Sequence, residues 1–331
     1  MLIKSHNETE VKVAYSTKDE SYLANIALLY YQEGLNQGQI ADRLGLSRAT
    51  IVNYLKEGRD RGIVDIRVNG ESLRTSSTGQ ELRKMFNLAD VYIANSGPKS
   101  DYSLALRQTA RVAALAFYNI IEPGDLIGVA WGETLRSIGE NLPNRKIANT
   151  SVCQIIGSME SDRVLSAEDC AIQIANRIGA QCYTLHSPAI LSSRSLAQEL
   201  KQEETIKAQL KRLKNLNAII TSVGDLSDNN HILSSGIISE NELEEIKNAG
   251  GAGFICSGFI QADGTMLSHH LQERMIAIHL EDILKTQKRI LVASGLKKVS
   301  AVTAALKGKF VTHAILDFEL AKAILEQNSE Y

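Results

Sequence analysis

Five polar side chains in the first quarter of the chain have the types and the spacing to bind another molecule. They are Ser47, Arg48, Thr50, Asn53 and Lys56. At 3.6 residues per helical turn they fall along one side of a helix, with the apolar side chains of the segment turned away from them. Arg, Asn and Thr can hydrogen-bond to base edges, and Lys and Arg contact phosphates. The spacing therefore indicates a helix with one polar binding face.

The residues around this helix predict the elements that position it. Residues 21–34 and 36–44 have apolar side chains at helical spacing, and Gly45 suits a left-handed turn between the second and third helices. Ser47 can cap the third helix, whose inward side chains we expect to be Ile51, Val52 and Leu55. Two helices joined by a tight turn, the second with a polar N-terminal half, form a helix-turn-helix. "GIVDIRVNG" (62–70) alternates like a strand and predicts a small β-wing.

The predicted winged helix-turn-helix spans residues 19–70, and its last helix has the character of one that enters the DNA major groove. An ordinary helical bundle with a solvated face is the alternative, because residues 36–70 hold six Lys/Arg against four Asp/Glu. Such a small excess fits binding as a dimer or tetramer better than one tight monomeric contact. We favour DNA, contacted through Gln37, Ser47, Arg48, Ala49, Thr50, Asn53, Tyr54, Lys56 and Arg59.

Length and composition limit the class of protein. The chain has 331 residues, 44% hydrophobic and 22% charged, with a net charge of −2, so two or more folding units without an overall basic field are expected. Residues 1–18 are polar and predict a mobile arm. Four Cys lie scattered without a paired motif, and no apolar run suits a signal or a membrane span. These features predict a cytoplasmic protein that does not bind a membrane.

Residues 71–331 predict a second, larger α/β domain. Apolar strand runs alternate with helices, which is typical of a doubly wound parallel sheet covered on both faces. We expect residues 195–215 to form one charged helical stretch, and residues 252–259 and 274–280 to form single strands.

Four loops that follow strands predict a shared ligand pocket, because ligands bind at the carboxyl ends of parallel strands. The loops carry Gly132, Glu133 and Thr134; Gly157 and Ser158; Gly224 and Asp225; and Gly295 with Lys297 or Lys298. Backbone amides, the Thr134 hydroxyl and a lysine at a helix start can hold phosphate oxygens. Any one of these loops is as easily explained as an ordinary turn between a strand and a helix, but four such loops together favour a pocket.

The sequence lacks the common catalytic and metal-binding motifs. No GxSxG, HExxH, Walker or GxGxxG pattern occurs. His269 and His270 are adjacent, and on a strand they would face opposite sides, which is a poor arrangement for a shared metal. We therefore predict no enzyme activity, no metal site and no cofactor.

Taken together, several segments resemble the SorC family of bacterial transcriptional regulators, sugar-sensing relatives of the DeoR group. The resemblance rests on "YYQEGLNQGQIADRLGLSRATIVNYLKEGRDRGIV", "DLIGVAWGETL", "GIISENELEEIKNAGGAGFICSGFIQADG", "MIAIHLEDI" and "RILVASGLKKVSAVTAALKGKFVTHAILD", in that order. It implies a winged helix-turn-helix joined to a Rossmann-like effector and oligomerisation domain similar to sugar-phosphate isomerases and CoA transferases. It further implies a dimer or tetramer that binds double-stranded operator DNA and responds to a phosphorylated sugar or polyol.

The resemblance also assigns site residues. Gly132, Glu133, Thr134 and Leu135 look like the family's phosphate-proximal turn, and Lys298 rather than Lys297 fits the family's lysine. The chain departs from the family at Ser294, Gly258, Gln261 and Asn53. The resemblance thus predicts a regulator of a carbohydrate or polyol catabolic operon.

An active sugar-phosphate isomerase with an appended DNA-binding module is the alternative function. Isomerisation through an enediol needs a carboxylate or His near the reacting carbons. Glu133, Asp225 and Asp263 are the candidates. The strand end at Ile156 offers no lysine, so a Schiff base from that position is excluded.

Overall fold

The computed structural model describes residues 19–64, 70–97, 100–159, 166–228 and 230–329. Contacts divide the chain into two compact units, residues 1–68 and 69–331. The arm predicted for residues 1–18 and most of the predicted wing lie outside the described residues.

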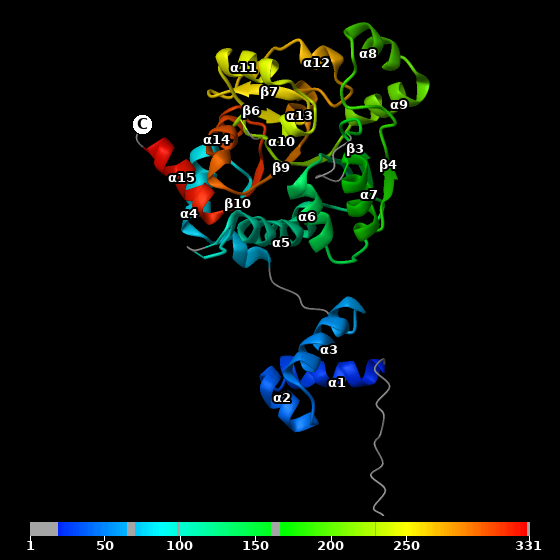
Figure 1. The fold of residues 1–331 in the computed structure, drawn as a ribbon, viewed down its shortest axis with the longest axis vertical. Coiled ribbons are helices and arrows are strands. Elements are labelled where there is room, and N and C mark those ends of the chain that lie inside the picture. The colour runs from blue at the N-terminus through cyan, green and yellow to red at the C-terminus, as the bar shows by residue number, and fades with distance from the viewer. Residues whose placement is uncertain (1–18, 65–69, 98–99, 160–165, 229, 330–331) are drawn as a thin grey trace, which may run out of the picture. The chain divides into compact units, whose positions relative to one another are not determined.

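The described part of the first unit contains three short helices: α1 (Glu20–Tyr31), α2 (Gln37–Leu44) and α3 (Arg48–Asp60) (Figure 1). Ser47 caps α3 by accepting a hydrogen bond from the Thr50 amide at 3.1 Å. Gly45 ends α2 in the left-handed conformation, as its position predicts.

The apolar faces of these helices meet in a small core that includes Ile26, Ile40, Ile51 and Leu55. The prediction that Val52 points inward was wrong, since Val52 is 41% exposed. It lies one turn after Arg48, so it falls on the outer side of α3.

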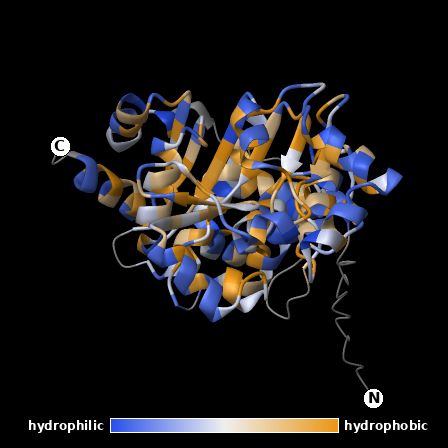
Figure 2. Ribbon diagram, turned by 90° about the horizontal axis from the view of Figure 1, so that it is seen from above, coloured by the Kyte–Doolittle hydropathy of each residue, from blue (hydrophilic) through white to orange (hydrophobic). Residues whose placement is uncertain are grey.

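A seven-stranded parallel sheet forms the centre of the second unit, which confirms the predicted α/β class. Its strands follow the order β1-β10-β9-β5-β2-β3-β4. Their bounds are β1 (Asp90–Ala94), β2 (Leu126–Val129), β3 (Ser151–Gln154), β4 (Gln181–Tyr183), β5 (Ala218–Thr221), β9 (Lys288–Ala293) and β10 (His313–Asp317). The strands are mostly buried, and Figure 2 shows their apolar residues at the centre with hydrophilic helix surfaces outside.

Helices in two groups cover the sheet. α5 (Tyr102–Ile120), α6 (Glu133–Asn141) and α7 (Ala167–Ile178) pack against one another and line the sheet from β1 to β4. α4 (Ser77–Phe86) and α15 (Phe318–Ser329) pack together beside β1, after the short helix η1 (Gly70–Arg74), and α14 (Val299–Lys307) adjoins α15.

A second, antiparallel sheet of three strands corrects two of the strand predictions. Residues 252–259 lie in a hairpin of β6 (Gly251–Ile255) and β7 (Gly258–Gln261), followed by β8 (Met266–Leu267). The chain reverses where Cys256 adopts a positive φ of 52°. Residues 274–280 are not a strand either, because they join α12 (Leu271–Arg274) to α13 (Leu280–Lys285) and make only isolated bridges.

Three further local details complete the fold. The charged stretch at 195–215 is two helices, α8 (Arg194–Leu200) and α9 (Glu204–Leu213), rather than one. Between β5 and β6 lie α10 (His231–Ser234) and α11 (Glu240–Asn248), the latter capped by Ser239. His269 and His270 follow β8 instead of lying on a strand, and their ring centroids are 4.2 Å apart, so the prediction that they face opposite sides was wrong.

The order of the strands creates a crevice between β2 and β5, at the carboxyl ends of the strands. From β2 the chain adds β3 and β4 outward on one side, and then β5, β9 and β10 on the other. The loops after β2 and β5 therefore diverge to opposite faces. In open parallel sheets, ligands bind at such a topological switch point, outside the carboxyl ends of the strands.

Candidate functional site

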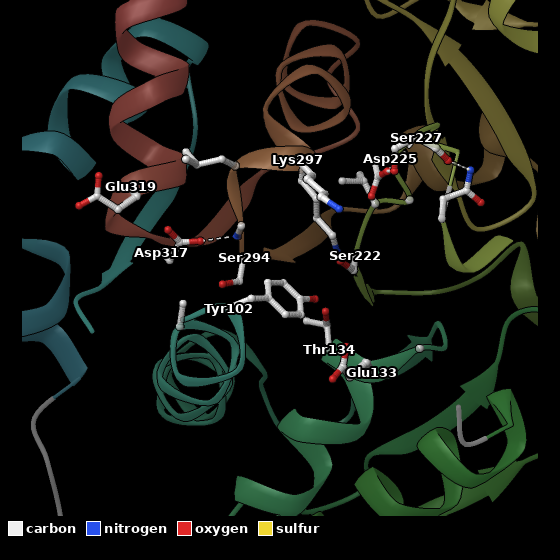
Figure 3. A pocket seen from close by; sticks show the side chains of 18 of the residues that line it. Tyr102, Glu133, Thr134, Ser222, Asp225, Ser227, Ser294, Lys297, Asp317 and Glu319 are labelled. Carbon is white, nitrogen blue, oxygen red and sulfur yellow. Dashed lines mark hydrogen bonds between the residues drawn. The ribbon is translucent and has the colours of Figure 1, made fainter. Parts of the chain in front are cut away.

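A cavity of about 640 Å³ lies at this switch point (Figure 3). Loops that follow β1, β2, β5, β9 and β10 form its wall. Polar groups from all five segments line it, and they include Asp101, Tyr102, Glu133, Thr134, Ser222, Asp225, Ser294, Lys298 and Asp317. A space of this size accommodates a small metabolite.

Most of the residues predicted to bind an effector meet in this cavity. They are Gly132, Glu133 and Thr134 at the start of α6, Gly224 and Asp225 after β5, and Lys298 at the end of the short helix η2 (Leu296–Lys298). These positions lie up to 166 residues apart in the chain (298 minus 132), yet parallel pairing of β2 with β5, and of β5 with β9, brings them together.

The other three predicted effector residues lie elsewhere. Leu135 is fully buried in the main core. Gly157 and Ser158 follow β3, on the far side of β2 from β5, and do not line the cavity. A Cβ on Gly157 would lie 2.4 Å from the carbonyl oxygen of Pro188, so this glycine permits close packing of two backbone segments.

Lys298 is the buried member of the lysine pair. It is 8% exposed and its Nζ donates to Ser222 Oγ at 3.1 Å, whereas Lys297 is exposed. Burial lowers the pKa of Lys298, against the opposing charges of Asp225 and Glu133. A buried ammonium with one hydroxyl partner keeps hydrogen-bond donors for an anionic ligand.

The start of α6 presents backbone amides to the same cavity. Gly132 precedes the helix with φ 109° and ψ 173°, and no side chain caps it. A Cβ at Gly132 would meet open space, but the conformation itself is strained for any other residue. The first amides of a helix lack intrahelical partners and carry a partial positive charge, so they suit an anion.

Hydroxyl and carboxylate groups line other parts of the wall. Ser294 Oγ is buried and has no hydrogen-bond partner among the described residues. The Tyr102 hydroxyl points toward Glu133 and Thr134 in Figure 3. Burial and the carboxylates of Glu133 and Asp225 raise the pKa of Tyr102 to about 12, so it remains a neutral donor at physiological pH. The wall therefore offers both hydrogen-bond donors and acceptors.

Sequence reasoning missed Tyr102, Ser222, Ser294 and Asp317. Asp317 lies at the end of β10 and accepts a hydrogen bond from the Gly295 amide at 2.6 Å. Both β1 and β10 were recognisable as strands, but their position beside β9 depends on the strand order. That order has no local signal in the sequence.

Some of the residues at which the chain departs from the family pattern line the cavity, and others do not. Ser294 lines the cavity, whereas Gly258 and Gln261 do not. A Cβ on Gly258 would lie 2.4 Å from Leu280 Cδ1, so packing explains this glycine. Gln261 donates to the Ala249 carbonyl at 3.0 Å and accepts from Thr265, so it stabilises the three-stranded sheet.

In the first unit, most of the predicted DNA-contacting residues lie on the exposed side of α3. Ser47, Arg48, Ala49, Asn53, Lys56 and Arg59 are exposed. Arg48 Nε donates to Gln37 Oε1 at 3.4 Å, which joins the starts of α3 and α2. Val52, which we expected to point inward, adds an apolar group to this side.

Two other predicted residues, Thr50 and Tyr54, are partly buried and contact neighbours within the unit. The Thr50 hydroxyl lies 2.8 Å from that of Ser47 at the helix cap. Tyr54 packs edge-to-face on Tyr22, with ring centroids 5.8 Å apart, beside the small core.

Within the described residues, none of the helices is long and apolar enough to cross a membrane.

The similarity of this chain to known proteins extends over both units. Residues 71–326 match the family described as "Putative sugar-binding domain". Over 90% of its length the chain is 30% identical to the uncharacterized transcriptional regulator YjhU of Escherichia coli K12, covering 92% of that protein. It is 28% identical to the deoxyribonucleoside regulator of Bacillus subtilis, over 90% of this chain and 95% of that one.

A solved structure covers both units. The full-length sorbitol operon regulator SorC of Klebsiella pneumoniae matches 93% of this chain and 99% of its own, with a TM-score of 0.69 and 26% identity.

Proposed function

Because the chain belongs to the SorC family of transcriptional regulators, we propose that a phosphorylated sugar or polyol in the strand-end cavity switches operator binding by α3. The regulated genes are then those of a carbohydrate or polyol catabolic operon. One observation carries the proposal for the cavity: buried Lys298 and the uncapped start of α6 line the same space.

The phosphate end of the effector fits this corner of the cavity. Lys298 contributes a cation, and the amides after Gly132 contribute donors and the positive end of a helix dipole. Thr134, buried at the start of α6, adds a hydroxyl at the same position. Charge-assisted hydrogen bonds of this kind contribute about 1.5–3 kcal/mol each.

The hydroxyl groups of the effector fit the remaining wall. Glu133 and Asp225 accept hydrogen bonds from sugar hydroxyls, while Tyr102 and Ser294 can donate or accept. The unpartnered Ser294 hydroxyl gains a partner when such a ligand binds, and an unmade buried hydrogen bond costs about 1–3 kcal/mol. A ligand with phosphate at one end and hydroxyl groups at the other satisfies both parts of the site.

The exposed face of α3 is the proposed reading surface. Arg48, Asn53 and Lys56 provide hydrogen-bond donors and positive charge, and Val52 provides an apolar contact of the kind that thymine methyl groups accept. Few basic residues occur on this unit, so we propose that two or four copies bind one operator together, in the cytoplasm.

We propose that the chain does not catalyse sugar isomerisation. Glu133 and Asp225 lie in the cavity, but Asp263 lies in the turn before β8, where its carboxylate accepts from the Thr265 amide at 2.9 Å. Asp263 does not line the cavity, so it is not a candidate for catalysis on a ligand bound there. The homologues named above are regulators, which supports the same proposal.

The test begins with a thermal-shift screen of sugar phosphates and polyol phosphates against the full chain. Operator DNA is selected from a random duplex pool, and each hit is then titrated into the complex. We expect a phosphorylated hit to change operator affinity, while the same hits show no turnover. Stabilisation by unphosphorylated sugars alone would contradict the phosphate site, and robust isomerisation would establish the enzyme instead.

A further inference from the structure

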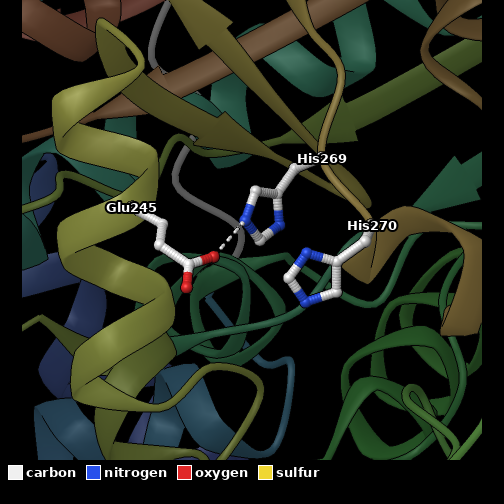
Figure 4. Close-up of side chains that lie close together, drawn as sticks. All are labelled: Glu245, His269 and His270. Carbon is white, nitrogen blue, oxygen red and sulfur yellow. Dashed lines mark hydrogen bonds and ion pairs between the residues drawn. The ribbon is translucent and has the colours of Figure 1, made fainter.

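A second group of polar side chains lies away from the effector cavity. His269, His270 and Glu245 each bring one potential ligand atom within 4.8 Å of the others (Figure 4). Glu245 comes from α11, and both histidines come from the segment between β8 and α12. The effector cavity is not lined by any of the three.

The distance between the potential ligand atoms of His269 and Glu245 suits a metal ion. His269 Nε2 and Glu245 Oε2 are 3.4 Å apart, which is long for an N–H···O hydrogen bond. Two ligand atoms about 2.0–2.1 Å from a tetrahedral Zn²⁺ ion lie roughly 3.3 Å apart. Ligation through Nε2 requires the ring proton to reside on Nδ1, and this gives up only the long 3.4 Å contact from the Leu271 amide.

The surroundings orient the other histidine. His270 Nε2 lies 3.4 Å from Glu242 Oε1, so the negative charge of this carboxylate favours the ring proton on Nε2 and leaves Nδ1 as the nitrogen that can ligate. A carboxylate that accepts from the second nitrogen of a ligating histidine fixes its tautomer and increases its basicity. Arg274 pairs with Glu242 at 2.7 Å and thereby holds this carboxylate in place.

Exposure differs among the three side chains in a useful way. His269 is only 9% exposed and its ring packs edge-to-face on Phe259, so one ligand is fixed. His270 and Glu245 are 56% and 59% exposed, so an ion can reach them and they can rotate to close the site. Among the described residues, no Lys or Arg forms an ion pair with Glu245, which leaves its charge for a cation.

We propose that His269, His270 and Glu245 bind one divalent transition-metal ion of the Zn²⁺, Co²⁺ or Ni²⁺ class. Two imidazoles and a carboxylate are ligands that these ions accept, and hard cations such as Mg²⁺ prefer oxygen alone. Three protein ligands leave at least one coordination position for water. The ion would link α11 to the segment that leads into α12.

The experiment uses the full chain without an affinity tag, stripped of metal by a chelator, and without DNA or effector. Titration calorimetry with ZnCl₂ and visible absorption with CoCl₂ measure stoichiometry and affinity. We expect one ion per chain, and a loss of affinity of about tenfold or more in both His270→Ala and Glu245→Gln. Both substituted side chains are exposed, so thermal melting without metal should stay unchanged.

His186→Ala is the matched control, because His186 is an exposed histidine outside the cluster. Its affinity for both ions should equal that of the wild type. The proposal is overturned if the wild type fails to bind one ion per chain, or if either His270→Ala or Glu245→Gln binds as tightly as the wild type. Because neither DNA nor effector is present, this result is independent of the proposed regulatory function.

Discussion

The outer face of α3 and the strand-end cavity differ in how the chain builds them. The face comes from one helix of 13 residues, whose polar positions recur every three or four residues. The cavity draws on segments from Ser96 to Glu319, which only the order of the strands brings together. A binding surface within one helix can be recognised locally, whereas a cavity between strands depends on contacts distant in sequence.

The two regions also differ in the environment of their charged groups. Arg48 and Lys56 are exposed, so in the proposed mode of DNA binding each contributes modestly and several copies act together. Lys298 is buried beside Glu133 and Asp225, where the low dielectric strengthens each interaction. Substitutions on the face should therefore spare the fold, and substitutions in the cavity should alter ligand affinity sharply.

The largest expected effect is on the helix face. Arg48→Ala should weaken operator binding by more than about 100-fold, because each base-edge contact contributes about 1–3 kcal/mol and symmetric copies lose it together. Fluorescence anisotropy with operator DNA measures this loss. Arg136→Ala removes an exposed arginine of α6 that pairs with Glu140, and it should bind operator normally. Equal affinity of the two variants would remove Arg48 from the reading surface.

Thr134→Ala comes next, and it tests the cavity. Loss of one hydrogen bond to a phosphate should weaken effector binding by about tenfold or more, with operator binding intact. Calorimetric titration of the effector into each variant is the measurement. Ser137→Ala, one turn further along α6, is the matched control and should bind like the wild type. Loss of operator binding by Thr134→Ala alone would indicate a role in folding or assembly.

Gly157→Ala tests whether Gly157 lies outside the effector site. The new methyl group would collide with the Pro188 carbonyl, so we expect the free energy of unfolding to fall by about 1–3 kcal/mol. Effector affinity should not change at temperatures where the variant is folded. Urea unfolding together with effector titration separates the two effects. An affinity loss without any loss of stability would return Gly157 to the effector site.

The smallest expected effect is a dependence on pH. Burial lowers the pKa of Lys298, and a bound phosphate raises it again by adding opposite charge. Between these two pKa values, binding takes up a proton, so affinity falls as pH rises, by at most about tenfold per pH unit. Effector titrations from neutral to alkaline pH measure the slope. A variant without the ammonium, Lys298→Met, should lose this slope, and an affinity that rises with pH would contradict it.

The success of a sequence prediction depends on whether the contacts involved are local or distant in the sequence. The cap at Ser47, the turn at Gly45 and the apolar positions Ile51 and Leu55 are local, and the structure confirms them. The prediction for Val52 was wrong because it depended on the apolar type of the residue alone. An exposed apolar residue is ordinary on a protein surface, so residue type alone does not decide its orientation.

In the second unit, the sequence predicts where strands occur more reliably than which strands lie side by side. The parallel sheet and the loops at Gly132, Gly224 and Lys298 were predictable, because strand ends and glycines are local features. Tyr102 and Asp317 were missed because their place in the wall depends on β1 and β10 lying beside β9. The hairpin at Cys256 was missed because a positive φ at a non-glycine residue has a weak sequence signal.

The most direct test of the regulatory function is an effector titration of preformed operator complexes, with wild type, Lys298→Met and Lys297→Met side by side. The two variants remove the same charge from adjacent residues, one buried and one exposed. A ligand shifts an equilibrium only through its differential affinity for the two states. We predict that Lys298→Met binds operator normally and needs at least about tenfold more effector to respond. Lys297→Met should respond like the wild type. A wild-type response by Lys298→Met would contradict the assignment of the cavity as the effector site.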